Sequence, residues 1–151
     1  MRLILTENHD LQETEVEIRY REIDSEVEGL IAAVKNSAGC VMGIKDNGDL
    51  VPIPFSKILY FEAVDRSVFA YTSDDVYKVR NTLQKLEEDT RDRCFVRISK
   101  PVIVNLKAVR KISPDSGRKL RLLLANKETV IVSRSFVGGL KKAIGMKGGD
   151  V

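Results

Sequence analysis

The sequence predicts a mainly β, α+β fold of small antiparallel β-sheets with short helices, preceded by an N-terminal strand and helix. Three observations support this class. Short runs of β-prone residues recur along the chain, turn-forming residues separate them, and the stretches with helical spacing of apolar residues are short. A chain of 151 residues can bury one core of its own, or form one domain with a small appendage.

The N-terminal piece has the pattern of a strand followed by a helix. Residues 13–21 alternate apolar and charged side chains, which predicts a strand with one buried face. The apolar positions are Val16, Ile18 and Tyr20. Asp24 or Ser25 opens the helix and residues 36–39 end it. The apolar side of this helix needs a surface to pack against.

The rest of the chain is rich in predicted strands. A hairpin is expected from residues 40–45 and 50–53, around the turn at 46–49. Further strands are expected at 58–63, 67–71, 76–79, 109–112, 120–124 and 129–132. One short helix is expected to start at an Asn81 cap and end near Asp89, and a terminal helix to start near Ser133.

Charge is distributed unevenly along the chain. The net charge is only +3, but residues 1–50 carry 5 Lys or Arg against 11 Asp or Glu, whereas residues 93–151 carry 14 against 3. Such a basic stretch attracts a polyanion, because binding to nucleic acid releases condensed counterions. The alternative interpretation is an ordinary solvated basic surface.

The sequence favours a cytoplasmic protein. No apolar run approaches the roughly 20 residues of a membrane-spanning helix, and the N-terminal residues do not lead to a secretory cleavage site. Cys40 and Cys94 stand in unrelated contexts, which favours reduced thiols over a reactive thiol or an intermolecular disulfide.

No catalytic constellation is evident in the sequence. His9 is the only histidine, so a histidine-based triad or a two-histidine metal site is excluded. A phosphate-binding glycine loop is missing, and the acidic clusters lack the ligand spacing of a calcium loop. We therefore expect a protein that is not an enzyme and has no cofactor, bound metal or small-molecule substrate.

Three segments resemble the LytTR family of DNA-binding domains. Residues 54–63 (PFSKILYFEA) look like its opening, where a polar residue and a short apolar strand lead into an acid and a loop. Residues 95–105 (FVRISKPVIVN) look like its central motif, and residues 130–134 (VIVSR) like the strand that ends before the last helix. The three segments occur in the family's order and span about residues 51–145.

The resemblance implies small antiparallel sheets that read promoter DNA with loops in the major groove, without a recognition helix. It assigns base reading to Arg66, Ser67, Lys100 and Arg134. Arg134 is the strongest candidate, because its planar guanidinium fits guanine O6 and N7, a contact worth about 1–3 kcal/mol of discrimination. A phosphate clamp or a salt bridge is the alternative for Arg134, and Lys100 suits a phosphate as well as a guanine.

The same resemblance implies further contacts with the DNA backbone. The residues concerned are Arg97, Ser99, Arg118, Lys119, Lys127 and Ser133. A second interpretation of Arg97 is that it packs within the protein. The turn residues Arg118, Lys119 and Lys127 have a second interpretation as ordinary solvated side chains. Asn105 is expected to fix its own loop.

The resemblance also implies a domain plan. We expect a strand–helix extension at 1–38, the LytTR domain at 39–145 and a flexible tail at 146–151. Many family members carry a phosphoacceptor receiver domain, for which the extension is too short. The extension packs either on its own domain or on a second subunit, and a homodimer on DNA would suit the repeated half-sites that the family reads.

Two functions remain open at this point. The first is a standalone bacterial transcription regulator that binds double-stranded DNA, for which family analogy adds a membrane protein encoded nearby as a partner. The second is a non-enzymatic protein-interaction or anti-regulator module that uses the same basic face for an acidic partner. Footprinting on the chain's own upstream DNA separates them.

Overall fold

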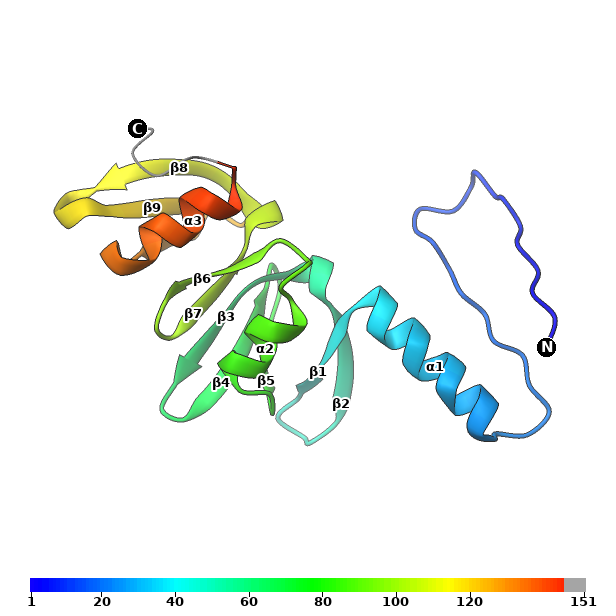
Figure 1. Ribbon diagram of the computed structural model, residues 1–151. Coiled ribbons are helices and arrows are strands. Elements are labelled where there is room, and N and C mark those ends of the chain that lie inside the picture. Colours follow the sequence, from blue (N-terminus) through cyan, green and yellow to red (C-terminus); the bar gives the residue numbers. More distant parts are fainter. Residues whose placement is uncertain (146–151) are drawn as a thin grey trace. The chain divides into compact units, whose positions relative to one another are not determined.

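A computed structural model describes residues 1–145, and the expected tail at 146–151 lies outside the described residues (Figure 1). The chain divides into two compact units. The first comprises Met1–Gly39, and the second begins at Cys40.

The first unit contains one helix and no strand among its described residues. Helix α1 spans Ser25–Ala38, and the Asp24 carboxylate accepts a hydrogen bond from the N–H of Val27 at 2.9 Å. Asp24, one of the two predicted openers, is therefore the N-cap. The predicted strand at residues 13–21 is wrong, because this segment has no hydrogen-bonded partner strand to complete a ladder.

The second unit is built on a seven-stranded antiparallel sheet with the order β2-β1-β5-β4-β3-β7-β6. The strands are β1 (Cys40–Ile44), β2 (Leu50–Pro54), β3 (Ile58–Val64), β4 (Ser67–Thr72), β5 (Val76–Val79), β6 (Phe95–Ser99) and β7 (Val102–Asn105). The hairpin predicted around residues 46–49 is confirmed as the β1–β2 pair, and the strands predicted at 58–63, 67–71 and 76–79 are confirmed as β3, β4 and β5.

A second, three-stranded sheet has the order β10-β9-β8. Its strands are β8 (Val109–Asp115), β9 (Lys119–Leu124) and β10 (Thr129–Val132), which confirms the three strands predicted there. Two short α-helices, α2 (Leu83–Asp89) and α3 (Val137–Ala143), accompany the sheets. Single 3-10 turns connect strands at Phe55–Lys57, Leu106–Ala108 and Ser116–Arg118, and another at Arg134–Phe136 leads from β10 into α3. The prediction of a mainly β fold with short helices is confirmed.

Both short helices begin later than the sequence predicted. The hydroxyl of Thr82, not Asn81, caps α2 by accepting the N–H of Lys85 at 3.1 Å. Both residue types cap helices well, so local sequence did not separate the two positions. Helix α3 starts at Val137 rather than near Ser133, because residues Arg134–Phe136 form a tighter 3-10 turn.

Two apolar clusters hold the second unit together. In the first, Phe55, Phe61 and Phe95 pack with ring centroids 5.7–6.4 Å apart, and Leu86 of α2 is fully buried with them. The second cluster joins residues of β3, β6 and β7 to residues of β9, β10 and α3. The small sheet and α3 are thus fixed to the β6–β7 side of the large sheet, which positions the turns described next.

Candidate nucleic-acid interface

The turn between β3 and β4 presents Arg66 to solvent. Val64 pairs with Ser67, so only Asp65 and Arg66 connect the strands, and both have left-handed backbone conformations with φ of 49° and 68°. Two successive positive φ values define the type I′ turn, whose twist suits a two-residue hairpin. Left-handed backbone is unfavourable for an arginine. Stability alone would therefore favour another residue where Arg66 stands.

The turn between β6 and β7 lies beside this first turn. Ser99 pairs with Val102, which leaves Lys100 and Pro101 as the connecting residues. The N–H of Ala63 in β3 donates to the carbonyl of Pro101 at 2.8 Å. Because β3 and β7 are antiparallel neighbours, the end of β3 and the start of β7 meet at the same edge of the sheet. Arg66 and Lys100 are therefore exposed on adjacent turns.

Arg134 is brought to the same region by Ser133. Both the N–H and the hydroxyl of Ser133 donate to the carbonyl of Ile98, at 2.9 and 3.2 Å. Ile98 precedes Lys100 by two residues, so the backbone beside Arg134 is fixed next to the β6–β7 turn. Arg134 itself is exposed at the start of its 3-10 turn. The hydroxyl proton of Ser133 is used inside the protein, which leaves the oxygen as an acceptor.

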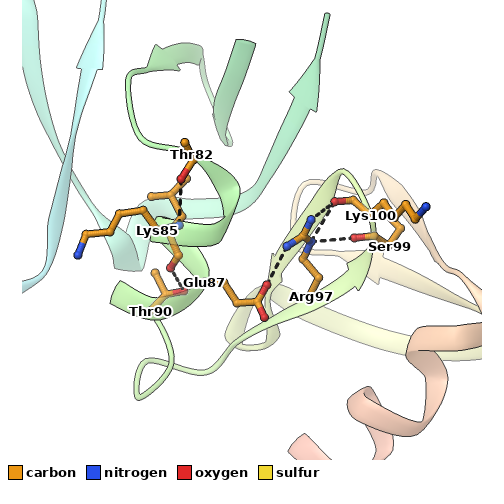
Figure 2. A network of polar contacts seen from close by, with 8 residues as sticks. Thr82, Lys85, Glu87, Thr90, Arg97, Ser99 and Lys100 are labelled. Carbon is orange, nitrogen blue, oxygen red and sulfur yellow. Dashed lines mark hydrogen bonds and ion pairs between the residues drawn. The ribbon is translucent and has the colours of Figure 1, made fainter. Parts of the chain in front are cut away.

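Arg97 holds the β6–β7 turn in place (Figure 2). Its Nε donates to the carbonyls of Ser99 and Lys100, each at 3.0 Å, and its Nη2 also donates to the Lys100 carbonyl. Its Nη1 contacts the Glu87 carboxylate of α2 at 2.8 Å. Every nitrogen of this guanidinium has an internal partner, so the geometry agrees with the packing interpretation of Arg97.

The remaining predicted backbone contacts fall into two groups. Arg118 and Lys119 lie at the end of β9 where Leu120 pairs with Val132, next to Ser133. Lys127 lies at the opposite end, beyond the pair Leu123 and Thr129. Residues 120–124 of β9 separate the two groups, which corresponds to about 17 Å of strand. The structure thus groups Arg118 and Lys119 with the other candidates and leaves Lys127 apart.

Arg121 is a basic residue that the motif comparison did not single out. It is exposed, and it lies two residues after Lys119, so both side chains point to the same face of β9. That face is the solvent side of the small sheet, because the alternate residues Leu122 and Leu124 are buried. The alternation in the segment KLRLLL contains this signal.

Asn105 fixes its loop as predicted. Its side-chain amide donates to the carbonyl of Ile58 at 2.9 Å, and its side-chain oxygen accepts the N–H of Lys107 at 3.0 Å. The side chain is 3% exposed, and both of its polar ends have partners. Asn105 therefore connects β7 to β3 and starts the 3-10 turn that leads into the small sheet.

Tyr60, which stacks on Tyr71, links the two sheets. Tyr60 and Tyr71 stack with centroids 4.3 Å apart, and their hydroxyls donate to Glu128 and Glu62 at 2.9 and 3.1 Å. Burial is the main cause that raises the pKa of Tyr60 and of Tyr71 above the ordinary value, and the adjacent carboxylates raise both further. The contact between Tyr60 and Glu128 holds the β9–β10 turn against β3.

The comparison with protein families identifies this fold. The LytTr DNA-binding domain matches residues 48–145, so this chain belongs to the LytTR family of DNA-binding domains. A solved LytTr DNA-binding domain from Bacillus cereus superposes with a TM-score of 0.67 at 29% identity, covering 71% of this chain and 97% of that one.

Similar full-length proteins occur in Staphylococcus aureus. An uncharacterised HTH-type transcriptional regulator of strain MRSA252 is 26% identical over 146 residues, covering 95% of this chain and 98% of that protein. An uncharacterised HTH-type transcriptional regulator of strain NCTC 8325 is 25% identical over 146 residues, again covering 95% of this chain and 98% of that protein. The similarity therefore extends into the first unit.

The described helices do not form a helix-turn-helix. Strands lie between α1 and α2 and between α2 and α3, so within residues 1–145 no two α-helices are joined by a short turn. None of the described helices is long and apolar enough to cross a membrane.

Proposed function

We propose that this protein is a transcription regulator that binds specific double-stranded DNA through three adjacent turns. In this proposal Arg66, Ser67, Lys100 and Arg134 read base edges in the major groove of repeated promoter sites. The observation that carries it is a pair of main-chain connections, from Ala63 to Pro101 and from Ser133 to Ile98. These hydrogen bonds bring candidates from three distant parts of the sequence to one edge of the fold.

The chemistry of the three turns suits base reading. Side chains on short turns of a rigid β scaffold project outward with little backbone freedom, which reduces the entropy lost on binding. Arg66 and Arg134 both offer a planar fork for guanine, and Lys100 offers a flexible point charge. The chain belongs to a family of DNA-binding domains, and this supports a nucleic acid as the partner of the surface.

Backbone contacts would surround these base readers. Ser99 is the last residue of β6, directly before Lys100. Arg118, Lys119 and Arg121 would extend the basic surface across the small sheet. Phosphate contacts fix register and supply the salt-dependent part of the affinity. We leave Lys127 out of the interface, because it lies at the far end of β9. We assign Arg97 to turn positioning, because its donors are used internally.

Footprinting on the DNA upstream of the chain's own gene tests this function. Protection of two spaced patches is expected, with affinity that falls steeply as salt rises. Arg134→Ala should weaken binding to the protected site by about 10- to 100-fold and relax its sequence preference. Lys45→Ala is the matched control, because Lys45 is exposed on the β1–β2 turn, and β5 and β4 separate β1 from β3.

Two results would contradict the proposal. If Lys45→Ala weakened DNA binding as much as Arg134→Ala, the effect would be one of general charge and not of base reading. A lack of protection even at low salt would favour the other function considered above, a protein-interaction module that binds an acidic partner with the same basic face.

A further inference from the structure

The first unit exposes most of its apolar side chains. Among its described side chains, Val27 is the only buried hydrophobic residue. Its exposed large hydrophobic residues are Met1, Leu3, Ile4, Leu5, Leu11, Val16, Tyr20 and Ile23. A piece of this size does not stay folded on so small a core. Its apolar surface therefore calls for a partner.

The segment at residues 15–21 (EVEIRYR) has a self-complementary order of charges. Glu15 and Glu17 precede Ile18, and Arg19 and Arg21 follow it. Residues 18–21 line the same groove as Val27 and Leu30 of α1. Apolar and charged side chains alternate along the segment, so in an extended strand Val16, Ile18 and Tyr20 would share one face and the charged side chains the other.

We propose that residues 15–21 pair in antiparallel fashion with the same residues of a second copy of this chain, centred on Ile18. In this register Ile18 faces Ile18 of the partner subunit, and Val16 faces the partner's Tyr20. Glu17 faces the partner's Arg19, and Glu15 faces the partner's Arg21. Two-fold symmetry repeats each contact, which is the usual geometry of a homodimer interface. This inference does not depend on DNA binding.

Charge matching selects this register over its neighbours. A shift of the centre to residue 17 places two Glu17 carboxylates opposite each other, and a shift to residue 19 does the same with two arginines. Like charges directly opposite destabilise an antiparallel pair. Registers centred between residues place apolar side chains opposite charged ones on the wrong face. Only the centre at Ile18 matches every charge and keeps all apolar residues together.

The helices complete the proposed interface. A two-stranded ribbon alone is marginally stable in water. Here the α1 helix of each copy would cover the apolar face of the ribbon with Leu30, Ile31 and Val34, which are only partly buried in the single chain. The unformed strand at residues 13–21 then has a simple explanation, because its hydrogen-bonding partner belongs to another molecule.

Sedimentation of the full chain without DNA tests the interface. Glu17→Arg and Arg19→Glu should each weaken the dimer at least tenfold, since each brings like charges together twice. An equimolar mixture of the two variants should restore a heterodimer, because positions 17 and 19 of one variant then face opposite charges on the other. The single swaps remove no buried contact, because the side chains of Glu17 and Arg19 are 76% and 86% exposed. Their intrachain ion pair at 3.5 Å is a weak surface contact.

Cysteine substitution tests the register independently. Facing residues of an antiparallel pair have Cα atoms about 4.5–5.5 Å apart, within disulfide range. Ile18→Cys should therefore form an 18–18 disulfide on oxidation. Val16→Cys is the control, because its two copies would lie about 13 Å apart along the ribbon. Peptide mass mapping separates these products from disulfides of Cys40 or Cys94.

Each alternative arrangement gives a result that overturns the proposal. These results are a wild-type chain that stays monomeric up to about 100 µM, a dimer that the single swaps leave intact, and a mixture that does not recover. The first would favour a chain that covers its own apolar surface. The second would favour dimerisation through another surface.

Discussion

The two units contain stretches with a similar tendency to form strands, yet they differ in what covers them. In the second unit, Phe61 of β3 is fully buried, because β4 and β7 pair with its strand on both sides and α2 lies over it (Figure 1). In the first unit, Val16 and Tyr20 are 63% and 54% exposed. The difference shows that an apolar pattern becomes a strand only where distant parts of the chain supply its partners.

Paired core and surface substitutions should show the largest difference between the units. Phe61→Ala removes a ring that packs against Phe55 and Phe95, and it should lower the free energy of unfolding by about 3–5 kcal/mol. At protein concentrations where the chain is monomeric, Val16→Ala should change it by less than about 0.5 kcal/mol. Urea denaturation followed by circular dichroism measures both. Equal effects would mean that residue 16 is part of a packed core.

Arg97→Lys tests whether the β6–β7 turn depends on its internal brace. A lysine has no fork to bind the carbonyls of Ser99 and Lys100 together, so specific DNA affinity should fall about 5- to 10-fold. The slope of log affinity against log salt should stay unchanged. Arg97→Gln removes the charge, and a slope reduced in magnitude by about 0.9 in that variant would instead make Arg97 a phosphate contact.

Glu87→Gln is the matched partner of that experiment. The Glu87 side chain is 48% exposed, so its ion pair with Arg97 is a surface contact of small energy. The substitution should therefore reduce DNA affinity less than Arg97→Lys does. A larger loss for the glutamate variant would mean that the ion pair, rather than the two carbonyls, positions the turn.

Tyr60→Phe tests the link between the sheets. Loss of the hydrogen bond to Glu128 should cost about 1 kcal/mol at neutral pH. The folded protein raises the pKa of Tyr60 and Tyr71 above 10.0, so their stabilisation is complete below pH 10 and is lost as pH rises further. The variant should lose less stability than the wild type between pH 9 and 11. Equal losses in both proteins would contradict the raised pKa of Tyr60.

Arg66→Gly should separate stability from DNA binding at the first turn. Glycine adopts a φ of 68° without strain, so the free energy of unfolding should rise by about 0.5–1 kcal/mol. DNA affinity should fall, because the guanidinium is lost. Arg66→Ala is the control, since it should weaken DNA binding equally without the gain in stability. Unchanged DNA affinity in both variants would remove Arg66 from the interface.

Local sequence was sufficient for most of the second unit. Turn residues and short β-prone runs located the hairpin at 46–49 and the later strands β3, β4, β5, β8, β9 and β10, because those signals lie within a few residues of each other. The strands β6 and β7 were not predicted. The family motifs supplied the candidate residues Lys100 and Arg134. Their adjacency was beyond local reasoning, since it depends on hydrogen bonds between residues far apart in the chain, such as Ser133 and Ile98.

The errors have related physical causes. The strand at residues 13–21 was predicted from alternation alone, which says nothing about whether a partner strand exists. The contact from Tyr60 to Glu128 spans 68 residues and leaves no local signal. Asn81 and Thr82 are both good caps, and the backbone geometry of the turn before α2 decides between them.

The most direct test of the central claim is an NMR titration of the full chain with DNA from its footprinted site. If the three turns form one DNA-binding edge, the backbone amides of Arg66, Lys100 and Arg134 should shift together at the same DNA concentration. The amides of Lys45 and Lys127 should stay unchanged. Shifts centred on Lys45 or Lys127, with the three turns unaffected, would contradict the proposed interface.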